Sequence, residues 1–166
     1  MRIIRYRLGD QVDYGVVLDG TVHTLESGPF GPLRAGKAVA SLSEVSLLAP
    51  CEPSKVVAVG INYAAHAAEH DLVVPGEPLL FLKPPSSVTG PGMPIVYPDH
   101  LSHWVEHEAE LAVIIGRRAR HLSPPGVAEA VLGFACANDV TARDLQRRDG
   151  QWSRSKSFDT FCPLGP

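Results

Sequence analysis

The run Glu108-Ala109-Glu110-Leu111-Ala112-Val113-Ile114-Ile115-Gly116 alternates two sets of side chains along the chain. Successive residues of a β-strand point to opposite faces, so the run predicts a strand with one apolar face. Glu108 and Glu110 take the opposite face with Ala112 and Ile114. Two carboxylates at this spacing lie roughly 6–7 Å apart, which allows them to share one cation. A solvated edge strand is the alternative for such a pair.

Other short strands are expected on both sides of this run. Residues 14–18 and 21–25 flank Asp19-Gly20, a dipeptide typical of a β-hairpin turn. Further segments with strand character are 3–8, 56–59, 79–82 and 134–140.

The expected helices are all short. One lies within the polar, Ala-rich segment 62–71. A second, over 124–132, can be capped by Ser123, and a third, ending at Arg148, is opened by what resembles a capping box at Thr141. These elements predict a mostly β protein with short helices, of the α+β class.

Length and composition favour an ordinary folded protein. The 166 residues are 45% hydrophobic and 20% charged, with a formal net charge of −3, which argues against disorder and against a basic nucleic-acid-binding module. We expect a small N-terminal β domain over residues 1–50, which carries no cluster of acid, base or metal-ligand residues, and a second domain over residues 51–166.

The sequence indicates neither a membrane segment nor a secretory signal. No stretch approaches the roughly 20 apolar residues of a membrane helix, and the first seven residues alternate charged with apolar side chains. Cys51, Cys136 and Cys162 lie far apart, which fits neither a disulfide framework nor a thiolate zinc site. We therefore expect a cytoplasmic protein without nucleic-acid or membrane partners.

A third carboxylate, Asp139, directly follows an apolar strand, where loops commonly carry functional groups. Together with Glu108 and Glu110 it would form an oxygen-rich site for a hard cation. Mg²⁺ is the default choice, because three carboxylates leave positions for water and substrate. Mn²⁺ and Ca²⁺ are the alternatives.

His66 and Glu69 are three residues apart and lie on one face of an expected helix. Glu69 could orient the imidazole and raise its basicity, which would make His66 a general base near neutral pH. A surface pair on a short helix is the alternative reading of this spacing.

Arg143, Gln146 and Lys156 follow Asp139 closely in the chain. Side chains of these types can hold a substrate carboxylate or stabilise a developing oxyanion. A nucleic-acid patch is the weaker interpretation of this basic region, because only Trp152 and Phe158 supply aromatic rings and the whole chain is acidic.

Six motifs, in this order, resemble the fumarylacetoacetate hydrolase family, bacterial type with a small N-terminal domain. The resemblance covers the chain from about Lys55 to its last residue. The motifs are Val59-Gly60-Ile61-Asn62-Tyr63 with His66 and Glu69, Phe81-Leu82-Lys83-Pro84-Pro85-Ser86-Ser87, Gly90-Pro91-Gly92, the run from Glu108 to Gly116, the run from Ala137 to Gln146, and the run from Lys156 to Pro166.

The resemblance implies a mixed β-sandwich roll, a homodimer and a role for each candidate residue. Glu108, Glu110 and Asp139 would be the metal ligands. His66 and Glu69 would form a catalytic dyad on a lid, and Lys83 and Ser86 would be architectural. The residues that would contact substrate are Arg143, Gln146 and Lys156, and Lys156 would also take part in catalysis by stabilising an oxyanion.

The family's substrates are oxo acids that present adjacent oxygens to one divalent cation. The resemblance implies Mg²⁺-dependent hydrolysis of a C–C bond in an acylpyruvate or fumarylpyruvate-type diketo acid. One alternative is an isomerase or decarboxylase of aromatic catabolism, of the 2-hydroxyhepta-2,4-diene-1,7-dioate type. The other is a truncated, non-catalytic protein that binds a metal or ligand.

The sequence departs from the family pattern in one respect. In the family the chain continues past the Cys-Pro-Leu-Gly-Pro segment with further strands, whereas this sequence ends there, at Pro166. We therefore expect a catalytic domain that lacks its C-terminal part, with strand edges and apolar surface left uncovered.

Overall fold

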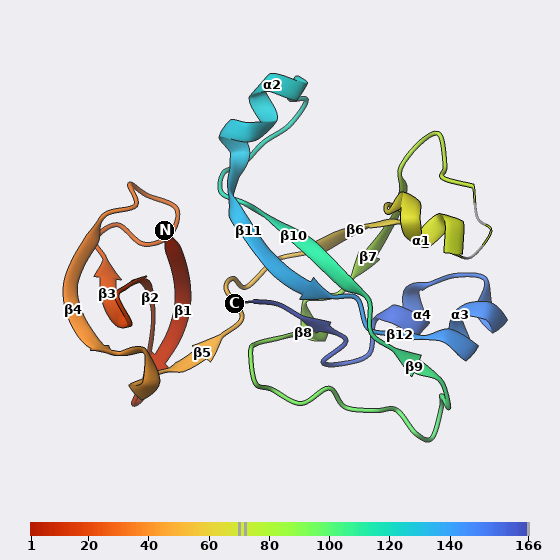
Figure 1. Cartoon of the computed structure of the whole chain (residues 1–166), viewed down its shortest axis with the longest axis horizontal. Coiled ribbons are helices and arrows are strands. Elements are labelled where there is room, and N and C mark those ends of the chain that lie inside the picture. The colour runs from red at the N-terminus through yellow and green to blue at the C-terminus, as the bar shows by residue number, and fades with distance from the viewer. Residues whose placement is uncertain (70, 72, 166) are drawn as a thin grey trace.

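The chain folds into short strands linked by loops and a few short helices (Figure 1). The computed structural model describes residues 1–69, 71 and 73–165, apart from the side chain of His66. The strands are β1 (Arg2–Leu8), β2 (Gln11–Leu18), β3 (Thr21–Leu25), β4 (Ala35–Ser41), β5 (Ser46–Leu48), β6 (Val56–Gly60), β7 (Leu79–Lys83), β8 (Val88–Thr89), β9 (Val105–Glu106), β10 (Ala109–Ile115), β11 (Val131–Asn138), β12 (Thr141–Ala142) and β13 (Cys162–Pro163). The α-helices are α1 (Ala64–Glu69), α2 (Pro124–Val127), α3 (Arg143–Asp149) and α4 (Ser153–Lys156).

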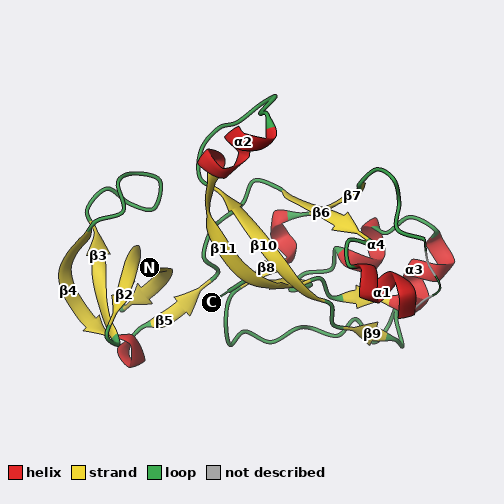
Figure 2. Cartoon of the chain, turned by 45° about the horizontal axis from the view of Figure 1, so that its top comes forward, coloured by secondary structure: helices red, strands yellow, loops and turns green. Residues whose placement is uncertain are grey.

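Strands β1 to β5 form one sheet in the order β4-β3-β2-β1-β5, and its observed pairs are antiparallel. Asp19 and Gly20 join β2 to β3 with φ of 47° and 77°, as a type I′ turn requires, so the expected hairpin is confirmed. Ile4, Tyr6 and Val22 are buried together in the core of this sheet. Figures 1 and 2 both show the sheet to one side of the remaining elements.

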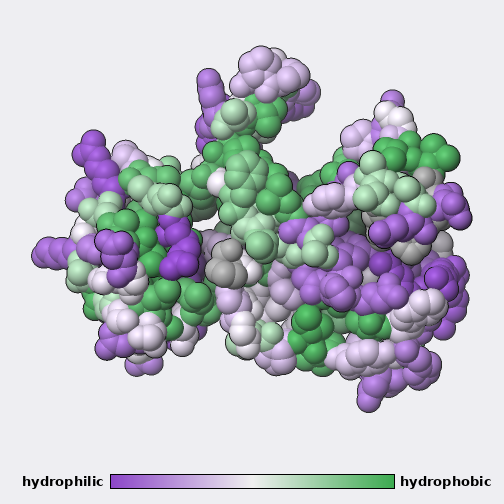
Figure 3. Space-filling view, in the orientation of Figure 1, coloured by the Kyte–Doolittle hydropathy of each residue, from purple (hydrophilic) through white to green (hydrophobic). Residues whose placement is uncertain are grey.

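A long hairpin of β10 and β11 occupies the middle of the molecule (Figure 2). Side chains alternate between the two faces of β10 as the sequence predicts, and the apolar set with Leu111, Val113 and Ile115 is the more exposed one. Phe134 lies opposite Val113 on β11 and is 67% exposed. Hydrophobic residues accordingly gather over this hairpin in Figure 3.

Two expectations about helix ends are wrong. The helix that begins after Ser123 gives way to a 3₁₀ turn over Ala128–Ala130. It cannot reach Leu132, because Val131 already pairs with Ile115 in the β-ladder. Neither Ser123 nor Thr141 caps a helix with its side chain. The Thr141 hydroxyl instead donates to the backbone oxygen of Asp139 at 2.9 Å.

A second core fixes the end of β11 against α3. Val140, Ala142, Leu145 and Phe161 are buried together there. The Val140 amide donates to the carbonyl oxygen of Phe161 at 3.2 Å, and the Asp139 amide donates to that of Glu108 at 2.9 Å. The backbone that carries Asp139 is therefore held on both sides. None of the helices within the described ranges is long and apolar enough to cross a membrane.

Gly60, the last residue of β6, lies directly under the ring of Trp152. A Cβ atom at Gly60 would lie 2.8 Å from Trp152 Cη2, well inside van der Waals contact. Trp152 also packs edge-on against Phe81 of β7, with ring centroids 5.4 Å apart. The missing side chain at Gly60 thus allows the Trp152 ring to rest on the β6–β7 hairpin.

We expect Gly60→Ala to lower the free energy of unfolding by about 1–3 kcal/mol, because the Trp152 ring is rigid and must shift. Urea unfolding measures the change. Gly133→Ala is the matched control, since a Cβ at this strand glycine meets nothing within 4 Å. In a Trp152→Leu background, Gly60→Ala should no longer lower the free energy of unfolding. Equal losses of stability in Gly60→Ala and Gly133→Ala would contradict the proposed contact between Gly60 and Trp152.

Candidate active site

Two buried lysines hold the carboxylate of Asp139. Lys83 Nζ, at the end of β7, lies 2.5 Å from Asp139 Oδ1, and Lys156 Nζ, at the end of α4, lies 2.6 Å from Oδ2. Both lysines are 2% exposed. Burial lowers the pKa of Lys83, while the charge of Asp139 and its hydrogen bond act to raise it. Each oxygen of Asp139 therefore has its own ammonium partner.

Glu108, directly before β10, is held in the same way. Its Oε2 lies 2.9 Å from Lys156 Nζ, and its Oε1 lies 2.5 Å from Arg143 Nη2. Burial acts to raise the pKa of Glu108, but the charges and hydrogen bonds of Lys156 and Arg143 outweigh it and hold this pKa below its usual value. Lys156 thus bridges two carboxylates that are 31 residues apart in the chain.

Arg143 opens α3 and makes two further contacts. Its Nε donates to Glu106 Oε2 at 2.7 Å, and its Nη1 donates to Gln146 Oε1 at 2.8 Å. Among the hydrogen bonds of the described residues the amide nitrogen of Gln146 does not appear, so its donors can serve another acceptor. Six side chains therefore form a chain of alternating charge, in the order Glu106, Arg143, Glu108, Lys156, Asp139 and Lys83.

Glu110, on β10, differs from these carboxylates because none of the ion pairs found within the described ranges includes it. Asn62 Nδ2 lies 3.4 Å from Glu110 Oε2. Burial raises the pKa of Glu110, and the charges of Asp139 and Glu108 raise it further, against the hydrogen bond from Asn62. The negative charge of Glu110 is thus the least compensated of the three proposed ligands.

The three carboxylates have the oxygen chemistry that a hard divalent cation prefers. Glu108 and Asp139 share the ammonium of Lys156, and Glu110 lies two residues after Glu108 on β10. Within the described residues, however, no three acidic, His or Cys side chains are arranged as a ready metal cage. The ammonium of Lys156 takes the place between Glu108 and Asp139. Each carboxylate oxygen has a second lone pair, so a metal would share these oxygens with Lys156.

Aromatic rings and one hydroxyl complete the surroundings of Lys156. Its Nζ donates to Thr141 Oγ1 at 2.7 Å and lies 5.2 Å and 5.7 Å from the ring centres of Phe81 and Trp152. All three hydrogens of the ammonium therefore have an oxygen partner, on Glu108, Asp139 and Thr141. Lys156 is fixed in direction by its partners.

Ion pairs and hydrogen bonds join five of the residues that the sequence indicates, which are Glu108, Asp139, Arg143, Gln146 and Lys156. Glu110 lies two residues after Glu108 on β10 and accepts from Asn62. Glu69 is exposed at the end of α1, whereas the side chain of His66 lies outside the described residues. Sequence reasoning missed Glu106 and treated Lys83 as architectural. Glu106 stands two residues before Glu108, so the repeated spacing of acids was an available signal.

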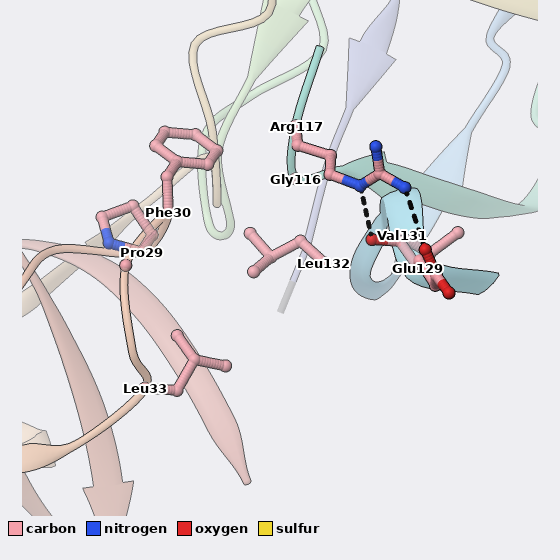
Figure 4. A pocket seen from close by; sticks show the side chains of 9 residues that line it. Pro29, Phe30, Leu33, Gly116, Arg117, Glu129, Val131 and Leu132 are labelled. Atoms are coloured by element: carbon pink, nitrogen blue, oxygen red, sulfur yellow. Dashed lines mark hydrogen bonds and ion pairs between the residues drawn. The ribbon is translucent and has the colours of Figure 1, made fainter. Parts of the chain in front are cut away.

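A cavity of about 290 Å³ lies elsewhere, between residues 29–33 and the far end of the β10–β11 hairpin (Figure 4). Phe30 and Leu33 line one side of it and Leu132 the other. Its charged residues, Arg117 and Glu129, are paired at 3.3 Å. This cavity contains none of the carboxylates of the ion chain.

Family models match the sequence over both of its parts. Residues 55–166 match the model described as fumarylacetoacetate (FAA) hydrolase C-terminal, and residues 1–50 match Rv2993c-like, N-terminal. Human mitochondrial oxaloacetate tautomerase FAHD2A is 48% identical over 137 residues, which cover 81% of this chain and 43% of that protein.

Solved structures share the fold. 5-Carboxymethyl-2-hydroxymuconate delta-isomerase from Mycobacterium smegmatis has a TM-score of 0.89 and 44% identity, covering 100% of this chain and 65% of that chain. Maleylpyruvate hydrolase from Sphingobium sp. SYK-6, in complex with manganese(II) ion and pyruvate, has a TM-score of 0.75 and 28% identity. The match covers 100% of this chain and 66% of that chain.

The chain spans about half the length of the curated relatives it matches and about two thirds of the solved structures. The expected fold class, mostly β with short helices, is confirmed by the elements and by these neighbours. The family model and the shared fold lead to the same assignment. The chain belongs to the fumarylacetoacetate hydrolase family.

Proposed function

We propose that this site binds a divalent cation together with a 2-oxo acid and promotes hydrolysis of the C–C bond of an acylpyruvate-type diketo acid. The observation that carries the proposal is that Glu108 and Asp139 meet at Lys156, next to Arg143 and Gln146, with Glu110 two residues after Glu108 on the same strand. Glu108, Glu110 and Asp139 would hold the cation, with Mg²⁺ or Mn²⁺ as the best candidates. When bound, the cation would supply Lewis-acid stabilisation of negative charge on the substrate.

Charge supports an anionic substrate. The ion chain contains three acids and three bases and is neutral, so Glu110 gives the site one negative charge. A divalent cation would reverse the sign of this charge, and the site would then attract a carboxylate. Maleylpyruvate hydrolase, whose structure contains manganese and pyruvate, is a relative with such a ligand pair.

The chain's own residues supply binding and proton transfer. The amide donors of Gln146 can bind a substrate oxygen. Lys156, whose three hydrogens already have oxygen partners, can stabilise negative charge that develops nearby through its positive charge. His66, assisted by Glu69, is the proposed base that removes a proton from the attacking water. The backbone of both residues lies in α1.

Isomerisation or tautomerisation is the second candidate function. It needs the same stabilised enolate but reprotonates it at another position instead of cleaving a bond. The relatives described as an isomerase and an oxaloacetate tautomerase are 44% and 48% identical to this chain, compared with 28% for the maleylpyruvate hydrolase. Decarboxylation and the truncated, non-catalytic metal-binding protein remain as further alternatives.

A substrate panel distinguishes these functions. We expect acetylpyruvate or fumarylpyruvate to lose diketo-acid absorbance and release pyruvate in the presence of Mg²⁺ or Mn²⁺. Isomerisation would instead change the absorbance of a hydroxymuconate-type diacid without release of pyruvate, and tautomerisation would accelerate the keto–enol exchange of oxaloacetate. Metal binding with no turnover in any assay would support the non-catalytic alternative.

Glu110→Gln is the sharpest test of the metal ligands, because it leaves the ion chain intact. At Mn²⁺ one hundred times above its Kd, binding stabilises the native state by about 2.7 kcal/mol, which corresponds to a rise in Tm of roughly 5–10 °C for a chain of this size. We expect Glu110→Gln to abolish this rise without lowering the metal-free Tm. An undiminished rise would contradict the assignment of Glu110.

Asp139→Asn should also abolish the stabilisation by Mn²⁺, but with a different effect on the metal-free protein. It removes the charge shared by two buried ammonium groups, so we expect a loss of about 3–5 kcal/mol in the free energy of unfolding. Urea unfolding without metal measures the difference from Glu110→Gln. Equal metal-free stability of the two variants would contradict this account of the lysines.

His66→Ala should leave Mn²⁺ binding unchanged and reduce turnover by a factor of at least about 100, the usual contribution of a positioned base. Calorimetric titration with Mn²⁺ and the absorbance assay measure the two effects. Unchanged turnover would exclude His66 as the base.

The expected homodimer also stays a prediction, which sedimentation equilibrium would test.

A further inference from the structure

Glu106 has no role in the site proposed above, yet it lies at the outer end of the ion chain. Its Oε2 accepts from Arg143 Nε at 2.7 Å, and its Oε1 accepts from Trp104 Nε1 at 2.7 Å. Each oxygen of Glu106 thus has one donor. Although its side chain is 41% exposed, Glu106 is held in one direction.

The backbone around Glu106 is also fixed. Glu106 pairs with Thr141 in the β9–β12 ladder, and the Arg143 amide donates to the carbonyl oxygen of Trp104 at 2.7 Å. Buried Ser102 donates to Asp144 Oδ1 at 2.6 Å, which anchors the loop before β9 on α3. The fold therefore presents Glu106 to Arg143 from a rigid support.

Glu106 and Glu108 divide one edge of the Arg143 guanidinium between them. Nε and Nη2 form the edge that a single carboxylate can occupy with two parallel hydrogen bonds. Here Nε binds Glu106, and only Nη2 is left for Glu108. Because Glu108 cannot take both donors, its second oxygen remains on Lys156, beside the proposed metal site.

We propose that Glu106 is a positioning residue, which occupies Arg143 Nε and thereby keeps Glu108 turned toward Lys156 and the proposed metal site. This inference rests on the proposed function of the site and adds a residue to it. If Glu106 loses its charge, Glu108 can pair with both Nε and Nη2 of Arg143. The carboxylate then turns away from the cation.

Glu129 offers a matched control. Its ion pair with Arg117 is also partly exposed, with 3.3 Å between Arg117 Nη2 and Glu129 Oε2. This pair belongs to the far end of the β10–β11 hairpin and has no contact with the ion chain among the described interactions. Glu129→Gln therefore removes one acidic group of the same kind without touching Arg143.

Mn²⁺ affinity, measured by calorimetric titration of the full chain, tests the proposal. We expect Glu106→Gln to weaken Mn²⁺ binding about tenfold while Tm changes little, and Glu129→Gln to leave the affinity unchanged. Trp104→Phe, which removes the second donor to Glu106, should weaken binding in the same direction by a smaller factor. Unchanged affinity in Glu106→Gln overturns the proposal.

A double-mutant cycle separates positioning from a general effect of charge. In an Arg143→Met background, Glu106→Gln should cause no further loss of Mn²⁺ affinity, because the residue acts through Arg143. The same tenfold loss in that background overturns the proposal, since it would show a direct effect of the Glu106 charge.

Failure of the proposed function would give a different result. If the wild-type protein binds no Mn²⁺, the proposed metal site is wrong. The coupling of Glu106 to Arg143 then remains measurable from urea unfolding of the metal-free single and double variants. Additive losses of stability overturn the inference, and non-additive losses support the division of the guanidinium between the two acids.

Discussion

Two buried ammonium groups, those of Lys83 and Lys156, hold the carboxylate of Asp139 and thereby fix the elements around the candidate site. A buried charge is costly unless it is paired and hydrogen-bonded, so Lys83 and Lys156 can be buried only where Asp139 meets both. These contacts join the end of β7, the end of β11 and α4, three segments far apart in the sequence. The same ion pairs therefore tie together the part of the chain after β5 and assemble its candidate active site.

The apolar parts of the chain explain why this arrangement is rigid. The core around Leu145 and Phe161 fixes α3 against the end of β11, and Trp152 rests on the β6–β7 hairpin because Gly60 has no side chain. Charged groups held from both sides by packed elements lose little further entropy when a ligand binds. Hydrophilic residues gather over α3 and α4 (Figure 3), where this rigid network meets the surface.

Local patterns predicted local structure well, and long-range contacts poorly. The Asp19-Gly20 turn and the alternation along β10 were predictable because each depends on neighbouring residues only. Val131 was wrongly placed in a helix, since its pairing with Ile115 lies outside any short window. The carboxylates were found from their spacing and the family motifs, whereas the partners of Lys83 and Glu106 became visible only when distant segments were brought together.

Three glutamates two residues apart show how the fold gives one chemical group three different properties. A hydrogen bond from Arg143 lowers the pKa of Glu106. Burial acts to raise the pKa of Glu108, but Lys156 and Arg143 together lower it. Burial and the nearby acids raise the pKa of Glu110. Spacing alone makes these residues equivalent, so their different properties arise from the basic side chains around each one. Glu106 pairs with Arg143, Glu108 links Arg143 and Lys156, and Glu110, in no ion pair of the described residues, keeps a charge that a ligand could neutralise.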